Sequence, residues 1–272
     1  MTMPFRGPPH LPRLGKLPPK IDSRTLRLSR YVAHLPAPPA AVDHFARVAI
    51  WPMFLNDVYG ICGPAGAAHQ IQSWSTYAER GTTTLPDVAV KNAYFRITGG
   101  SDTGVYIIDM LKYWNHYGIG LDFIEAYAQL QSGSRDEHSL AMYYFGSVGI
   151  GLALPDVGTF GPWDRVYGAP NQHNGHYVCG VGYDADGLWV VTWGELVRMS
   201  WEFLAKYNDE SWAIFNDLSL LEATMRSPES FDRAQLEADL FLLSDPITPP
   251  GDLPPTPGPG CLARLVGKGW LW

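Results

Sequence analysis

The sequence predicts an α+β fold in which a helical half comes first and an antiparallel sheet follows. A pattern of small and apolar residues at helical spacing runs from Gly63 to Glu79, and further helical patterns come after it. From Val148 on, the pattern changes to short apolar runs separated by turn residues, which is typical of strands. Because the helices precede the strands instead of alternating with them, we expect two lobes with the functional cleft between them.

The composition indicates a folded globular protein. The chain has 272 residues, of which 46% are hydrophobic, and it contains ten tryptophans. It is therefore long enough to bury a sizeable core. Its three cysteines, Cys62, Cys179 and Cys261, are far apart and form no CxxC pair. We therefore expect no disulfide framework, no metal site, no cofactor and a reducing compartment.

No segment suggests export or membrane insertion. No run approaches about 18 apolar residues, and prolines stand near the N-terminus where a signal peptide needs an apolar run. We expect a protein without a signal peptide, a transmembrane segment or a membrane partner, located in the cytoplasm.

Residues 1–41 have the composition of an extended, basic arm. Proline recurs along this segment, which fixes φ and removes backbone donors. Residues 1–30 hold seven Lys or Arg and one acidic residue, whereas the rest of the chain holds 13 basic and 26 acidic residues. This asymmetry favours contact with the acidic body of the same chain, with a neighbouring subunit or with a polyanion. Nucleic acid is the less favoured partner, because Phe5 is the single aromatic residue in 1–30.

The folded domain is predicted to span residues 42–244, after a short helix at 23–33 within the arm. Its helical half has loop signals at 81–87, including Pro86-Asp87, and at 99–104, where glycines cluster. Apolar residues at helical spacing then predict helices over 105–115 (stopped by Gly118), over 123–130 (closed by Gly133) and over 137–145.

The second half is predicted to supply the sheet. Strands are expected over 148–154, 176–183 and 188–193, the last two joined by a turn at 184–187. The long loop 155–174 forms a rim before the second of these strands. Residues 201–214 are predicted to form a helix followed by a strand, and 217–243 a further helix. Residues 245–272 are a proline- and glycine-rich linker that leads to an apolar tail, 262–272, which we expect to dock on a protein surface.

One cysteine stands where its thiol gains reactivity. Asn56-Asp57 and Gly60 form a turn signal that brings Cys62 to the start of the small-residue helix. Backbone N–H groups at a helix N-terminus are unpaired and carry partial positive charge, so a thiol there ionises more easily. The thiolate is the form that attacks a carbonyl carbon, and it needs a base nearby. His176, in a predicted strand, is the candidate base.

Three segments resemble the papain-like cysteine peptidases. The first segment, residues 59–66, surrounds Cys62, the second, 176–183, begins at His176, and the third ends at Trp193-Gly194. From the first to the last, they span about half of the chain. The resemblance implies a papain-like fold, with a helical lobe carrying Cys62 packed on an antiparallel sheet carrying His176, and a peptide or protein substrate. The segment Asn56-Asp57-x-x-Gly60-x-Cys62 is also similar to a motif of uncharacterised actinobacterial and phage proteins.

The first segment aligns with the family in two ways. If Gly60-x-Cys62-Gly63 is matched to the glycine and structural cysteine of the family motif, the nucleophile position falls on Ala65 and the chain is an inactive relative. If Cys62 is matched to the nucleophile, Asn56 stands where the family keeps its oxyanion-hole glutamine. We prefer the second alignment as a hypothesis, and the first stays open.

The third catalytic position is also open. The family's asparagine falls on Val191 or Thr192, and of the two only the threonine hydroxyl is able to orient an imidazole. The resemblance further implies that Trp193 shields the His176 site. Asn174, which lies on the rim before His176, and Trp193 are the candidates for contact with substrate.

Two functions of different classes fit these observations. The first is a thiol hydrolase, a peptidase or amidase, whose candidate catalytic residues are Cys62, His176, Asn56 and Thr192. The second is a catalytically inactive papain-like structural or assembly protein, for example a component of a phage virion. Such a protein would bind copies of itself or other chains through residues 1–41 and 262–272, and it would be associated with the virion.

Overall fold

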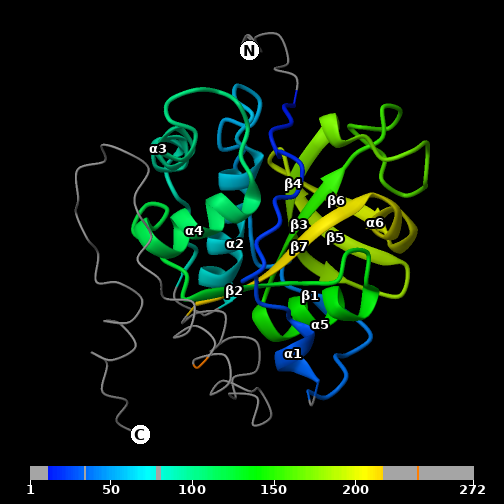
Figure 1. The fold of residues 1–272 in the computed structure, drawn as a ribbon. Coiled ribbons are helices and arrows are strands. Elements are labelled where there is room, and N and C mark those ends of the chain that lie inside the picture. Colours follow the sequence, from blue (N-terminus) through cyan, green and yellow to red (C-terminus); the bar gives the residue numbers. More distant parts are fainter. Residues whose placement is uncertain (1–11, 34, 78–80, 217–237, 239–272) are drawn as a thin grey trace, which may run out of the picture.

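The computed structural model describes residues 12–33, 35–77, 81–216 and 238. These residues form a helical lobe and a sheet lobe that lie side by side, which confirms the predicted α+β fold (Figure 1). No helix among the described residues is long and apolar enough to cross a membrane.

The helical lobe is built on three helices, α2 (Cys62–Tyr77), α3 (Asp87–Ile97) and α4 (Ile107–Tyr117). Helix α2 is buried over nearly its whole length, because its many Gly, Ala and Ser residues let neighbouring elements approach closely. Its Trp74 stacks on Trp114 of α4, with ring centroids 5.8 Å apart. Helices α2 and α4 correspond to the helices predicted over 63–79 and 105–115.

The sheet lobe contains one seven-stranded antiparallel sheet in the order β2-β7-β3-β4-β5-β6, with β1 paired to β4. Its strands are β1 (Val42–Asp43), β2 (Ala126–Gln129), β3 (Val148–Ala153), β4 (Gly175–Tyr183), β5 (Gly187–Thr192), β6 (Glu195–Ser200) and β7 (Asn208–Phe215). The core on one side of this sheet includes residues of the helices α1 (Ser29–Val32), α5 (Arg135–Phe145) and α6 (Trp201–Tyr207). The core on the other side contains α2, α3 and α4.

Strands β4 and β7 are buried on both faces. In β7, Trp212 and Ile214 pack into the core of the helical lobe, whereas Ala213 and Phe215 pack into the core of the sheet lobe. The central strands therefore read as nearly continuous apolar runs, since both of their faces are covered. The cores of both lobes therefore pack on the same central strands.

Several sequence-based predictions need correction. Residues 126–129 form strand β2 instead of part of a helix over 123–130, because their burial alternates and they pair with β7. Helix α3 was not predicted. It begins directly after Pro86, its N-cap residue, so the Pro86-Asp87 pair marks a helix start as well as a loop.

Two further elements differ from expectation. Strand β6 was not predicted, because it lies at the edge of the sheet and most of its side chains are only partly buried, which weakens the apolar signal. The short helix predicted over 23–33 is confined to α1. The helix predicted over 217–243 and the tail 262–272 with Cys261 lie outside the described residues, apart from residue 238.

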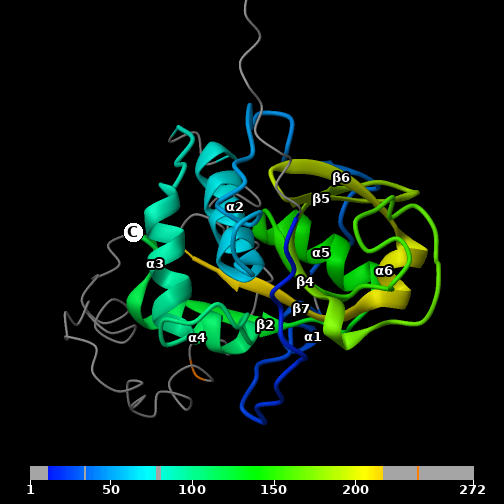
Figure 2. The same ribbon diagram turned by 90° about the horizontal axis from the view of Figure 1, so that it is seen from above.

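The arm packs against its own chain. From Pro12 to Lys20 it runs between the two lobes, as the dark blue trace in Figures 1 and 2 shows. Further along, Asp22 forms an ion pair of 2.8 Å with Lys112 of α4, and the backbone N–H of Leu28 donates to strand β2. The domain boundary at residue 41 stays a prediction.

Candidate active site

Cys62 is the first residue of α2, and only 1% of its surface is exposed. The predicted turn before it is present, and Phe54 and Leu55 both adopt positive φ there. The turn is held by the helical lobe, because the backbone N–H of Gly60 donates to Asp102 Oδ1 at 2.9 Å. The sequence before Cys62 therefore places the thiol at a defined point on the edge of this lobe.

His176 lies on β4 and is fully buried. Its Nε2 is 2.6 Å from Thr192 Oγ1, at the end of the neighbouring strand β5. Its ring stacks on Trp193, with centroids 4.3 Å apart and planes inclined by 19°. Of the two candidates for the third position, Thr192 thus contacts the imidazole, whereas Val191 packs in a small apolar cluster with Cys179. Nδ1 of His176 has no hydrogen-bond partner among the described residues.

The two lobes bring Cys62 close to the strand that carries His176. The backbone of Tyr177, the residue after His176, is near enough to lower the pKa of the Cys62 thiol, against the larger effect of burial. No hydrogen bond joins the thiol to Nδ1 of His176. Helix α2 approaches β4 so closely that a Cβ atom on Gly66 would lie 2.7 Å from the Tyr177 ring. Glycine at this helix position therefore allows the close approach.

Asn56 faces a backbone carbonyl in the cleft. Its Nδ2 donates to the carbonyl of Arg13 at 3.0 Å and to that of Tyr59 at 3.2 Å. From the other lobe, Trp193 Nε1 donates to the same Arg13 carbonyl at 3.1 Å. The carbonyl of Arg13 is therefore held by side chains of both lobes.

The arm runs between the segments that carry Cys62 and His176. The backbone N–H groups of Gly15 and Lys16 donate to Gly175 O at 3.2 and 3.1 Å, directly before His176. On the helical side, Val105 N donates to Gly15 O at 2.8 Å, and Leu17 N donates to Val105 O at 2.9 Å. A Cβ atom on Gly15 would lie 1.8 Å from Gly60 O, so only glycine fits here. The arm thus forms backbone hydrogen bonds with both lobes.

Burial keeps the Cys62 thiol and the His176 imidazole neutral in this structure. It raises the pKa of Cys62 to about 11, although backbone hydrogen bonds from Tyr177, Gly63 and Gly15 and the charge of Lys16 act in the opposite direction. It lowers the pKa of His176 to about 3, and the nearby charge of Lys16 lowers it further. This differs from the expected easily ionised thiol, because the desolvation of Cys62 outweighs the effect of the helix N-terminus.

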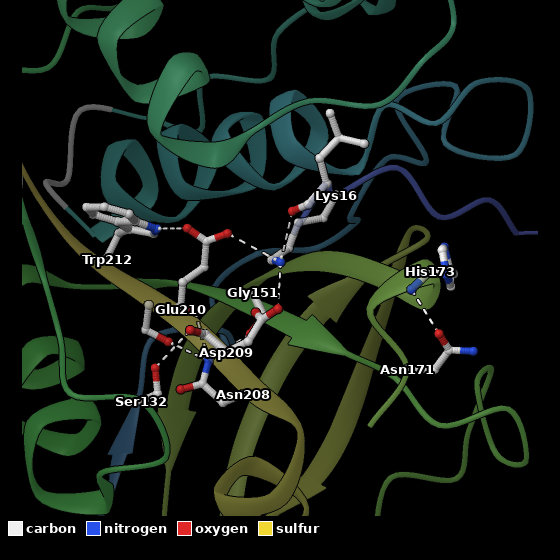
Figure 3. A network of polar contacts seen from close by, with 11 residues as sticks. Lys16, Ser132, Gly151, Asn171, His173, Asn208, Asp209, Glu210 and Trp212 are labelled. Carbon is white, nitrogen blue, oxygen red and sulfur yellow. Dashed lines mark hydrogen bonds and ion pairs between the residues drawn. The ribbon is translucent and has the colours of Figure 1, made fainter. Parts of the chain in front are cut away.

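Asn174 has its side chain engaged within the rim. Its Nδ2 donates to Asp156 Oδ1 at 2.8 Å, and Asn171 Nδ2 donates to the same oxygen at 2.6 Å. Asn171 Oδ1 in turn accepts from the backbone N–H of His173 (Figure 3). The predicted contact of Asn174 with substrate has no support in these hydrogen bonds, which hold the two ends of the loop together.

Sequence reasoning missed a charged cluster beside the site. The buried Lys16 Nζ lies 2.8 Å from Asp209 Oδ2 and 3.3 Å from Glu210 Oε1 (Figure 3). The signal that was available is the adjacent acidic pair Asp209-Glu210 at the start of a segment that is otherwise apolar. Within the described ranges, no group of three or more His, Cys, Asp or Glu residues is placed to hold a metal ion.

The comparisons with known proteins establish the fold. A scan against protein-family models and a search of curated proteins gave no match. Among solved structures, the chain is similar to xylellain, a cysteine protease from Xylella fastidiosa, with TM-score 0.56, 15% identity and coverage of 75% of this chain and 96% of that one. It is also similar to procathepsin L 3 of Tenebrio molitor larval midgut, with TM-score 0.53, 15% identity and coverage of 71% and 74%.

A third similar structure contains the cysteine protease and lectin-like domains of Cwp84 from Clostridium difficile, with TM-score 0.50, 13% identity and coverage of 77% of this chain and 57% of that one. At these identities the likeness concerns the fold alone. The fold is therefore papain-like, with Cys62 on the central helix and His176 on the sheet. The similarity to actinobacterial and phage proteins stays a prediction.

Proposed function

We propose that this protein is a thiol hydrolase, a peptidase or amidase, that acts through a dyad of Cys62 and His176. The observation that carries the proposal is that Asn56 and Trp193, the residue that stacks on His176, donate to the same Arg13 carbonyl. Two residues further along the arm, Gly15 packs against Gly60, just before Cys62, and bonds to Gly175, just before His176. This grouping supports the alignment of Cys62 with the nucleophile, in which Asn56 takes the place of the family's oxyanion-hole glutamine.

The proposed reaction uses these groups in turn. His176 takes the proton of Cys62, and the thiolate attacks the carbonyl carbon of the substrate amide. Asn56 Nδ2 and the backbone N–H of Cys62 donate to the oxyanion as it forms. His176 then gives its proton to the leaving nitrogen as the C–N bond breaks, and water resolves the acyl-enzyme. Thr192 holds the imidazole, and Trp193 covers it.

The carbonyl of Arg13 supports the role given to Asn56. It is a peptide carbonyl in the cleft that already accepts a hydrogen bond from Asn56 Nδ2 at 3.0 Å. The same contact implies that the closed form is latent, because the arm fills the space that a substrate needs. We expect the arm to leave the cleft before a substrate enters.

The second candidate is a papain-like protein without activity, which binds neighbouring subunits of an assembly, such as a phage particle, through its terminal arms. The occupied cleft and the threonine at the position of the family's asparagine favour it. Residues of the arm such as Lys16, Leu28 and Tyr31 are buried against their own chain, however, and so are not free for a neighbour in this form. This observation argues against assembly through this part of the arm.

A variant that displaces the arm from between the two lobes tests the proposal. Gly15→Ala places a Cβ atom 1.8 Å from Gly60 O in the closed form, so the full-length variant is expected to open the cleft. Iodoacetamide at pH 6 should then alkylate Cys62 faster than it alkylates a model thiol, and the variant should hydrolyse fluorogenic peptides. Gly168→Ala is the matched control, because a Cβ atom there meets nothing within 4 Å. A Cys62 that reacts no faster than the model thiol in the opened variant would falsify the proposal and leave the inactive protein.

A further inference from the structure

The side chain of Lys16 fills a pocket whose walls belong to the body of the protein. Its Nζ ends between Asp209 and Glu210 of β7 (Figure 3). None of the side chain is exposed. We call this the Lys16 pocket, formed by Gly151, Asp209, Glu210 and Trp212. Burial of two carboxylates around one ammonium group is unfavourable unless the charges are paired, so the pocket has a strong requirement for a cation.

The shape of the pocket depends on Gly151. A Cβ atom at this position would lie 2.5 Å from Lys16 Cε and 2.7 Å from Glu210 Cγ. The absence of a side chain in the middle of β3 therefore leaves a channel for four methylene groups. Trp212 Nε1 donates to Glu210 Oε2 at 3.0 Å and so fixes the carboxylate at the end of this channel.

The pocket retains acceptor capacity when Lys16 is in place. Glu210 is 2% exposed, and its Oε1 makes no hydrogen bond with the described residues, although it lies 3.3 Å from Lys16 Nζ. Asp209 Oδ1 is likewise buried without a hydrogen-bond partner in this part of the chain. A guanidinium group, which has five donors, would satisfy more of these oxygens than an ammonium group does.

The pocket lies next to the proposed reaction centre. Gly151 precedes Leu152, which pairs with His176 across β3 and β4. The backbone of Lys16 donates to Gly175 O, and its neighbours Gly15 and Leu17 bond to Val105. A peptide that adds to the cleft by the same backbone hydrogen bonds would therefore send one side chain into the pocket while its main chain passes Cys62 and His176.

We propose that the Lys16 pocket is a specificity subsite that binds a lysine or arginine side chain of a peptide substrate, and that Lys16 occupies it in the closed form as a substrate side chain would. The inference rests on the proposed hydrolase function and adds the class of substrate. A neutral side chain would leave the two carboxylates unpaired, and an acidic one would add a third negative charge. Both are therefore selected against.

The test of specificity uses full-length Gly15→Ala protein and fluorogenic peptides that differ at one position, which is lysine, arginine, norleucine or glutamate in turn. At the position read by the pocket, we expect kcat/KM to be roughly 10- to 100-fold higher for lysine and arginine than for norleucine. Glu210→Gln should reduce this ratio, and Glu202→Gln, at an exposed position of α6, should leave it unchanged. An active enzyme with no preference for basic residues at any position overturns the inference.

A second measurement does not depend on turnover. Full-length Lys16→Ala protein, whose pocket is vacated, is heated with n-butylammonium chloride or with sodium chloride at equal ionic strength. We expect n-butylammonium to raise the Tm of Lys16→Ala. It should not raise the Tm of Lys20→Ala, which removes an exposed lysine of the same arm that pairs with Asp109. It should also not raise the Tm of the double variant Lys16→Ala, Glu210→Gln. Stabilisation without hydrolysis of any peptide would support the cation pocket and refute the hydrolase.

The absence of a selective rise in Tm would overturn the inference, since the vacated pocket would then show no affinity for the cation it is proposed to recognise. The peptide comparison leaves Lys16 in the sequence, so it decides the question if Lys16→Ala does not fold. The two proposals can therefore be refuted separately. Absence of turnover refutes the hydrolase, and absence of selectivity for a cation refutes the Lys16 pocket as a subsite.

Discussion

A single hydroxyl group orients the imidazole of the proposed catalytic base. Thr192 Oγ1 is 2.6 Å from His176 Nε2, and both side chains are buried. A hydroxyl group can donate or accept, so this contact fixes the orientation of the ring and is compatible with either neutral tautomer. The proposed mechanism needs the tautomer in which Nε2 donates to Thr192 Oγ1 and Nδ1 is left to accept a proton. In the proposed mechanism the hydroxyl orients the imidazole, as an asparagine does in the papain-like cysteine peptidases that the chain resembles.

The Thr192→Val variant tests this role. It keeps the shape of the side chain but leaves Nε2 of a buried histidine without a partner, which we expect to lower the free energy of unfolding by about 1–3 kcal/mol. The kcat/KM of the opened enzyme should fall as well, because the ring loses its orientation. Urea denaturation and peptide hydrolysis measure the two effects. Thr192→Ser keeps the hydroxyl and should retain most of both properties, so equal losses in the two variants would argue against an orienting hydroxyl.

Asn56 is expected to have two separable effects. Removal of one oxyanion donor typically lowers kcat by ~10²–10³-fold, so Asn56→Ala should slow hydrolysis in the Gly15→Ala background. In the otherwise unchanged chain, the same substitution removes the hydrogen bond to Arg13 O and should make Cys62 more accessible to iodoacetamide. Asp57→Ala, on the same turn, is the control. If Asn56→Ala reduces turnover no more than Asp57→Ala, Asn56 is not an oxyanion donor.

At the scale of residues, local patterns indicate only part of the candidate site. Cys62, His176 and Thr192 each stand in a short motif that their neighbours in sequence make recognisable. Lys16 and Asp209 are 193 positions apart, and no periodic pattern links an arm to a strand at that distance. The pairing of Lys16 with the acidic residues is visible only once the arm has been placed in the cleft.

At the scale of elements, the close packing of α2 on β4 sets the distance between the two lobes. Gly66 lies at a close approach of the two elements, because a Cβ atom there would be 2.7 Å from the ring of Tyr177. Gly66→Ala should therefore lower the free energy of unfolding by about 1–3 kcal/mol through overpacking, despite the better helix propensity of alanine. It should also slow hydrolysis, because it pushes the helix that carries Cys62 away from the strand of His176.

Thermal denaturation and peptide hydrolysis, both in the Gly15→Ala background, check this prediction. The exposed Gly168→Ala variant is again the control, since its added methyl group meets no neighbour. A Gly66→Ala protein with unchanged stability would mean that the Tyr177 ring moves aside freely and that the contact does not set the separation of the lobes.

The predictions of elements succeeded where one periodicity was dominant. Helices α2 and α4 and strands β3 and β4 have long runs with a single pattern, and the sequence predicted each of them. The prediction for β2 was wrong because its alternating residues were read at helical spacing. The strand forms only through its pairing with β7, more than 80 residues away. Tertiary pairing of this kind is not encoded in a local window.

At the scale of the whole molecule, three buried histidines make stability depend on pH. Burial lowers the pKa of His69 to about 4, of His138 to about 4 and of His176 to about 3. Unfolded histidines take up protons below about pH 6.5, while the folded ones stay neutral, so the free energy of unfolding should fall as the pH drops from 6.5 towards 4 and 3. Glu210, whose pKa is raised by burial, acts with the opposite sign.

Urea denaturation at pH 7.5 and pH 5 measures the net effect, which we expect to follow the three histidines. His138→Gln should show a smaller difference between the two pH values, whereas His173→Gln, at an exposed position, should retain it. Equal stability at both pH values would show that these histidines do not remain neutral in the folded protein.

The two lobes share their central strands, and this predicts that they unfold together. Leu152 of β3 packs in the core of the sheet lobe, and Ile214 of β7 packs in the core of the helical lobe, yet β3 and β7 are paired neighbours. Loss of either core exposes a face of the same sheet, so neither lobe retains a complete core alone. Leu152→Ala and Ile214→Ala should each lower the free energy of unfolding by about 2–5 kcal/mol and shift one common transition. Tryptophan fluorescence and far-UV circular dichroism should give coincident curves in both variants. An early transition in Ile214→Ala alone would show instead that the helical lobe, and with it Cys62, separates from the sheet before the molecule unfolds.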